Sequence, residues 1–178
     1  MSRPDAVAPR AVLIGIGSPY RRDDGIGPAL AAAIQRAASP GVTVTDSDGE
    51  PSALLDAWSG VPLAVVVDAV LCAVPEPGRI HRTALDLAPG SAVSPAGAAA
   101  AGLGAGAAAA STHGLGVPDA LRLAQALDRT PGRLVVFAVE AADLGFGSAL
   151  SPAVAACLPD LIRVVLAELG TAAAGSGP

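Results

Sequence analysis

The 178-residue chain contains no lysine, two histidines, two cysteines and only four aromatic residues. Without lysine, it cannot build a lysine-dependent phosphate loop or carry out Schiff-base chemistry. Its basic residues are 11 arginines and its acidic residues number 16, which gives a formal net charge of -5. Scattered arginines at this charge do not form the basic face that nucleic-acid binding requires. Nucleic acid is therefore not an expected partner.

The cysteines and the hydropathy pattern indicate in which cellular compartment the protein is expected. Cys72 and Cys157 lie far apart with no CxxC spacing, which is typical of reduced, buried thiols in a cytoplasmic protein. The first ten residues lack the apolar segment of a signal peptide. Mean hydropathy is high at +0.54, but glycine, proline and serine interrupt the longest uncharged stretch, residues 87–118. We expect a soluble protein without a membrane partner, and a monomer, because no separate apolar interface is evident.

Apolar and alternating segments predict a regular order of strands and helices. Strands are expected at 11–17, 41–47, 62–70, 78–85 and 133–140, and helices at 28–38, 51–60, 117–127 and 151–169. The segment 78–85 alternates between apolar and polar residues, which favours an outer strand. This order predicts an α/β fold, a three-layer sandwich with a five-stranded, mostly parallel sheet and helices on both faces. Pro159 should kink or divide the last helix.

One domain, residues 11–169, accounts for these elements. Residues 1–10 and 170–178 are polar or small and are predicted to be disordered. The Ala/Gly-rich connection at 86–112 is too long for an ordinary link, so it is either a mobile flap or a solvated insertion.

The candidate chemistry lies where buried strands end, because sites in parallel sheets form beyond the carboxyl ends of the strands. Asp24, Asp68 and His113 come from three segments that could meet at that edge. Taken singly, each has an ordinary structural explanation: a helix cap, a loop cap and a loop histidine. Together, two carboxylates and one imidazole would bind a divalent metal such as nickel or zinc and leave coordination positions open. His81 is expected on a solvated strand face.

Four separated blocks carry a family resemblance. They are GIGSPYRRDDGIGP (15–28), VVVDAV (65–70), STHGLGVPDALRLAQAL (111–127) and VVFAVEAADLGFGSALSPAV (135–154). In order and spacing, the chain resembles the hydrogenase maturation protease family over 11–169. The resemblance implies a twisted five-stranded sheet and a cytoplasmic endopeptidase. Such an enzyme removes the C-terminal extension of a nickel-loaded nickel–iron hydrogenase large-subunit precursor.

The same resemblance implies which residues act. Asp24, Asp68 and His113 would be catalytic and would contact nickel carried by the substrate, for which another divalent metal could stand in vitro. The substrate-binding residues would be Gly17, Ser18, Asp23, Gly25, Thr112 and Glu140. Ser18 replaces the family's usual asparagine, and the insertion at 91–110 precedes the histidine motif. Whether the metal or a carboxylate activates water stays open.

Two other functions remain open on the sequence. A nickel-sensing escort protein would keep the same three ligands and bind the precursor without cutting it. A small-molecule enzyme could use Cys72 as a nucleophile with His113 as base, which requires a lowered thiol pKa.

Overall fold

The structure is a computed structural model that describes residues 9–36, 40–87, 110–111 and 116–174. Its main sheet has the strand order β2-β1-β3-β6-β4. The strands are β1 (Ala11–Ile16), β2 (Val42–Ser47), β3 (Leu63–Leu71), β4 (Ile80–Asp86) and β6 (Arg133–Glu140), and the two-residue β5 (Ala110–Ser111) pairs with β3. All pairings in the five-strand order are parallel except that of β4 with β6.

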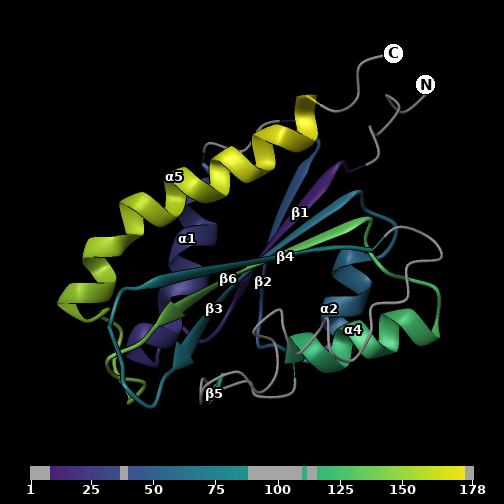
Figure 1. The fold of residues 1–178 in the computed structure, drawn as a ribbon. Helices are drawn as coiled ribbons and strands as arrows, with labels where there is room; N and C mark the ends of the chain where they lie inside the picture. Colours follow the sequence, from purple (N-terminus) through teal and green to yellow (C-terminus); the bar gives the residue numbers. More distant parts are fainter. Residues whose placement is uncertain (1–8, 37–39, 88–109, 112–115, 175–178) are drawn as a thin grey trace, which may run out of the picture.

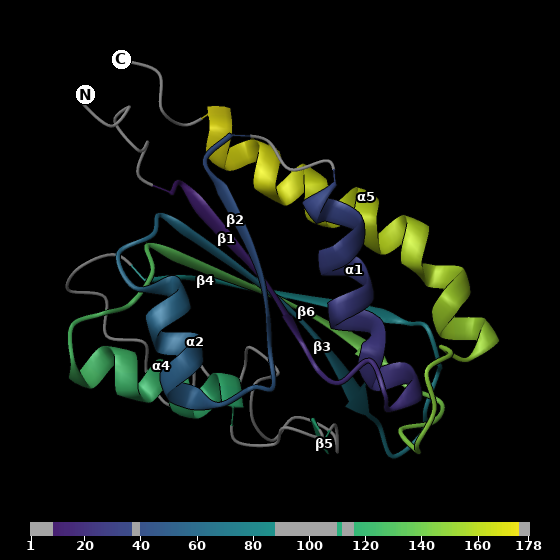
Figure 2. The ribbon, with the colours of Figure 1, turned by 180° about the vertical axis from the view of Figure 1, so that it is seen from behind.

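Helices cover both faces of this sheet (Figure 1). Helices α1 (Ile26–Gln35) and α5 (Pro152–Ala174) lie on one face, and α2 (Pro51–Trp58) and α4 (Gly116–Ala126) lie on the other, as the reverse view in Figure 2 also shows. The described residues thereby form two apolar cores, one on each face of the sheet. Alternate residues of β3 enter opposite cores, Val65 on the α1/α5 side and Val66 on the α2/α4 side. The predicted three-layer α/β sandwich is confirmed.

The sequence pattern of each strand follows from its place in the sheet. The strand β3 lies between β1 and β6, and eight of its nine residues are buried, which explains its unbroken apolar run. The strand β4 is at the edge, and from Arg82 to Asp86 its residues alternate between exposed and partly buried. This confirms the prediction of an outer strand near residues 78–85.

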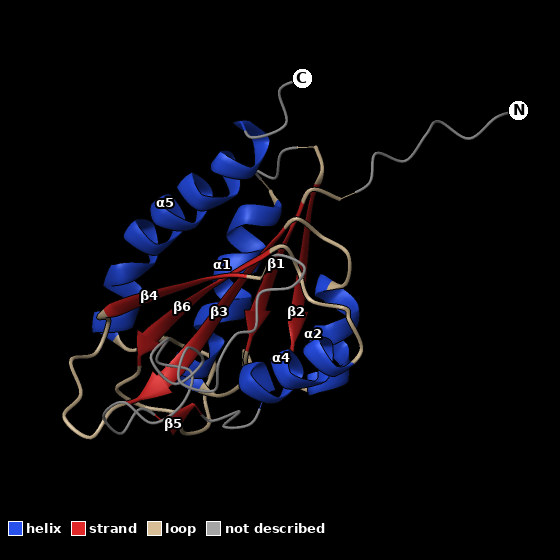
Figure 3. Ribbon diagram, turned by 45° about the vertical axis from the view of Figure 1, so that its right-hand side comes forward, coloured by secondary structure: helices blue, strands red, loops and turns tan. Residues whose placement is uncertain are grey.

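The last helix corrects two expectations. It runs without a break from Pro152 to Ala174 (Figure 3), with Pro159 inside it. Of the two outcomes predicted for Pro159, a kink or a division of the helix, the division does not occur. Proline removes one backbone hydrogen bond, but Leu161 and Val165 are fully buried against the sheet and hold the helix in place. The start of the tail predicted to be disordered, up to Ala174, is therefore helical.

The structure does not test the remaining expectations for the two ends of the chain and for the Ala/Gly-rich connection. Residues 1–8, 175–178 and nearly all of the 86–112 connection lie outside the described residues. Among the helices that are described, none has the length and apolar character needed to cross a bilayer.

Candidate active site

The turn after β1 brings two acidic residues into the protein. A short 3-10 helix, η1 (Arg22–Gly25), follows that turn, and Asp23 and Asp24 within it are both 0% exposed. The Asp24 Oδ2 accepts a hydrogen bond of 2.9 Å from the backbone N–H of Ser18. Ser18 thus orients the Asp24 carboxylate through its backbone amide. Gly25 ends the 3-10 helix and is also buried.

The approach of this turn to the strand end depends on Gly17. Its φ is +129°, and a Cβ atom there would lie 1.9 Å from the carbonyl oxygen of Asp24. Any side chain would both strain the backbone and collide with the turn. Gly17 therefore fixes Asp24 at the carboxyl end of β1, where η1 packs against the neighbouring strand β3.

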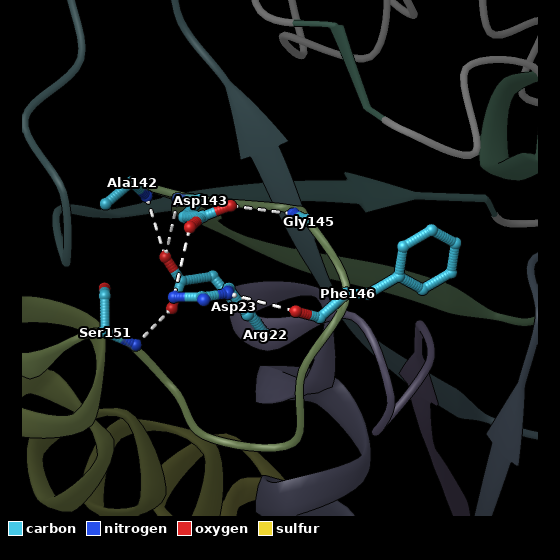
Figure 4. Close-up of polar contacts among 7 residues, drawn as sticks. All are labelled: Arg22, Asp23, Ala142, Asp143, Gly145, Phe146 and Ser151. Atoms are coloured by element: carbon cyan, nitrogen blue, oxygen red, sulfur yellow. Dashed lines mark hydrogen bonds and ion pairs between the residues drawn. The ribbon is translucent and has the colours of Figure 1, made fainter.

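The Asp23 carboxylate faces the protein's own backbone (Figure 4). Its Oδ2 accepts hydrogen bonds from the N–H groups of Ala142 at 2.8 Å and Asp143 at 3.0 Å. Its Oδ1 accepts from the N–H of Ser151 at 2.6 Å. Asp23, expected from the resemblance to bind substrate, thus secures both ends of the segment between β6 and α5.

Arg22 holds the middle of that segment. Its backbone N–H donates to the carbonyl of Gly147 at 2.7 Å, and its Nε donates to the carbonyl of Phe146 at 3.2 Å. Its guanidinium also forms an ion pair of 3.2 Å with Asp143. The Phe146 ring points away from the Asp23 carboxylate and is 90% exposed (Figure 4). Two segments distant in sequence, η1 and residues 141–151, therefore form one rim of the site.

Asp68 lies inside β3, three residues before its end, and is 6% exposed. It is in register with Ala138 of β6, which in turn is in register with His81 of β4. Side chains alternate along a strand, so Asp68 shares the α2/α4 face of the sheet with Val66. The structure thus places Asp24 and Asp68 at the carboxyl ends of the neighbouring strands β1 and β3.

His113 and Thr112 lie outside the described residues. The nearest described segment is β5, which pairs antiparallel with the end of β3. Its last residue, Ser111, is in register with Val70, two residues after Asp68. The chain therefore passes beside the carboxyl end of β3 immediately before the histidine motif.

Glu140, the last residue of β6, is 3% exposed, and both its oxygens have partners within the chain. Oε2 accepts from the backbone N–H of Glu76 at 2.6 Å, and Oε1 lies 2.7 Å from Nε2 of His81. The Glu76 hydrogen bond, with smaller contributions from His81 and Cys72, lowers the pKa of Glu140 despite its burial. Glu140, a predicted substrate-binding residue, is held as a carboxylate by its own chain.

His81 is only partly what the sequence predicted. Its side chain is 44% exposed, but its ring is bound to Glu140. The sequence reasoning did not use the spacing of His81 and Leu85, which lie four residues apart. Side chains alternate along β4, so both lie on the same face, and Leu85 packs against the α2/α4 core.

Cys72 and Cys157 are both free thiols, as predicted, but each is only partly buried. Burial, followed by the charge of Glu140, raises the pKa of the Cys72 thiol. A nucleophilic cysteine needs the opposite shift. The structure therefore disfavours the hypothesis of Cys72 as a nucleophile.

Comparison with solved structures identifies the fold. The chain is similar to the hydrogenase maturating endopeptidase HybD from E. coli, with 21% identity, a TM-score of 0.68 and coverage of 91% of this chain and 93% of that one. It is also similar to the nickel–iron hydrogenase maturation protease HybD from Thermococcus kodakarensis, with 19% identity, a TM-score of 0.65 and coverage of 88% and 96%. No family model and no curated protein matches the sequence.

These likenesses define the class of fold. An endopeptidase from Escherichia coli solved in solution gives a TM-score of 0.72 at 21% identity, over 90% of this chain and 91% of that one. The protein thus has the α/β fold of the solved hydrogenase maturation proteases over nearly its whole length. The resemblance recognised in the sequence is confirmed at the level of the fold.

Proposed function

We propose that this protein is a cytoplasmic, monomeric endopeptidase that removes the C-terminal extension of a nickel–iron hydrogenase large-subunit precursor. The observation that carries the proposal is the fold that this chain shares with solved maturation proteases. In this chain, the two acidic residues of the resembling motifs, Asp24 and Asp68, are buried at the carboxyl ends of adjacent strands. Buried carboxylates are costly unless they serve a charged or hydrogen-bonding partner.

In this proposal, Asp24, Asp68 and His113 contact nickel that the precursor carries. The two carboxylates supply negative charge and the imidazole supplies a nitrogen ligand, a set suited to nickel. The pairing of β5 with β3 supports the inclusion of His113, since His113 follows two residues after Ser111. Three ligands without a thiolate bind weakly on their own, so the enzyme would respond to nickel already held by the substrate.

Cleavage adds water across one peptide bond: hydroxide goes to the acyl carbon and a proton to the leaving amine. In this reaction Asp24 and Asp68 hold the scissile segment beside the metal that it carries. The Ser18 amide keeps the Asp24 carboxylate in a fixed orientation. The rim formed by η1 and residues 141–151 would guide the C-terminal extension into place.

The test is a cleavage assay on the cognate precursor, nickel-loaded and nickel-free, with the released peptide followed by mass spectrometry. We expect release only with nickel, and loss of release in Asp24→Asn, Asp68→Asn and His113→Ala. Asp160→Asn is the matched control, because Asp160 is exposed on α5 and lies outside the site. Precursor that binds but stays full length in every condition would overturn the protease and leave the escort function.

A further inference from the structure

Three side chains of metal-binding type meet where β3, β6 and β4 lie side by side. Cys72 follows the last residue of β3, His81 is the second residue of β4, and Glu140 ends β6. One ligand atom from each, sulfur, nitrogen and oxygen, lies within 4.8 Å of the other two. Because β6 lies between β3 and β4, this Cys–His–Glu cluster joins three adjacent strands.

The distances among the three atoms can be compared with those among the ligands of a bound zinc ion, because none of the three exceeds 4.8 Å. Zinc lies about 2.3 Å from sulfur and about 2.0–2.2 Å from nitrogen or oxygen, so its tetrahedral ligands lie roughly 3.5 Å apart. The His81 nitrogen and the Glu140 oxygen are 2.7 Å apart and would have to separate slightly. His81 is 44% exposed, so its ring has room to turn. Rotation of the His81 ring can therefore widen its distance from Glu140.

The Glu140 carboxylate is held in position by hydrogen bonds, as metal-ligating carboxylates commonly are. The N–H of Glu76 donates to Oε2 at 2.6 Å and fixes the carboxylate, while Oε1 faces His81. Once the thiol proton has left to solvent, the thiolate of Cys72 and the carboxylate of Glu140 together balance a dication. The neighbouring cation, Arg79, is paired with Glu76 at 3.0 Å, and both of those side chains are more than half exposed.

The same arrangement does not suit a nucleophile. Glu140 is hydrogen-bonded to both Cys72 and His81, so the carboxylate and not the imidazole is the partner of the thiol. A thiol next to a carboxylate is not activated for attack. The mixed sulfur, nitrogen and oxygen donors are instead typical of borderline cations such as Zn²⁺.

We propose that Cys72, His81 and Glu140 bind one divalent transition-metal ion of the Zn²⁺ class, with a fourth position open to solvent on the His81 side. The site shares no residue with the set of Asp24, Asp68 and His113. It does not depend on the proposed protease function. Bound there, the ion ties together three neighbouring strand ends.

The test is a titration of the reduced, EDTA-treated full-length protein with Co²⁺, which reports a thiolate ligand through a charge-transfer band in the near ultraviolet. We expect the band to saturate at one ion per chain, and to bleach when Zn²⁺ displaces Co²⁺. Cys72→Ser should abolish the band. His81→Ala should weaken binding at least about tenfold, the lower bound for losing even an outer-shell partner. Circular dichroism checks that each variant is folded.

Two matched variants separate this site from the rest of the molecule. Cys157→Ser removes the other thiol, which lies on α5 and donates to the Val154 carbonyl. Asp24→Asn alters the candidate active site. Both should keep the band and the affinity. The proposal is wrong if the unaltered protein shows no saturable band, if the band survives Cys72→Ser, or if either of these two variants abolishes it.

Discussion

The substitution Asp23→Asn tests whether one buried carboxylate holds the segment between β6 and α5. Asparagine keeps the shape but has a single acceptor oxygen, which can serve the N–H groups of Ala142 and Asp143. Its NH₂ group would then face the N–H of Ser151, so that donor loses its 2.6 Å partner. Losing a hydrogen bond to a charged group and leaving a partly buried donor unsatisfied costs about 3 kcal/mol.

That cost predicts a measurable loss of stability in a protein that still folds. A domain of this size shifts by about 2–4 °C per kcal/mol, so the melting temperature should fall by about 6–12 °C. Thermal and urea unfolding measure the change, and hydrogen exchange should show faster exchange of the amide of Ser151. Asp160→Asn is the control: its side chain is 73% exposed, and its ion pair with Arg163 should contribute less than about 0.5 kcal/mol. If Asp23→Asn unfolds like Asp160→Asn, the three hydrogen bonds do not anchor the segment.

Three further outcomes follow from close packing, core burial and thiol chemistry. Gly27→Ala should destabilise by about 1–3 kcal/mol or more in urea unfolding, because its Cβ would lie 2.3 Å from a β1 carbonyl oxygen. Leu161→Ala should cost about 2–5 kcal/mol in the same assay, whereas Leu166→Ala, at a residue 39% exposed, should cost much less; equal losses would contradict the packing of α5. Because burial and Glu140 raise the pKa of Cys72, its alkylation in metal-free protein should reach half-maximal rate above the pH of an ordinary thiol, and Glu140→Gln should lower that midpoint. Peptide mass spectrometry against pH measures it, and an unchanged midpoint would exclude the Glu140 contribution.

The rim of the site depends on contacts across the sequence. Asp23 and Arg22 bind residues that lie about 120 positions later in the chain. These contacts are mostly from side chains to backbone N–H and carbonyl groups, which carry no sequence signal of their own. The adjacent carboxylates Asp23 and Asp24 look equivalent in the sequence, yet one anchors a loop and the other is oriented by Ser18.

The sequence by itself determined the layers of the fold, because burial of a strand or of one helix face leaves a periodic apolar pattern. The run around Val65 and the alternation around His81 indicated a buried and an outer strand, and both are confirmed. The same local reasoning allowed the last helix to be divided at Pro159, and that division does not occur, because burial of the residues that follow outweighs a lost backbone hydrogen bond.

Only the tertiary structure decided which distant side chains meet. Strand order placed β6 between β3 and β4, and so brought Cys72, His81 and Glu140 together. No spacing in the sequence encodes that meeting, since each residue lies on a different strand and the order of strands in the sheet differs from their order in the chain. A histidine that looks solvated along its own strand thus became part of a cluster through a neighbouring strand, because contacts across a sheet depend on strand pairing as well as on local pattern.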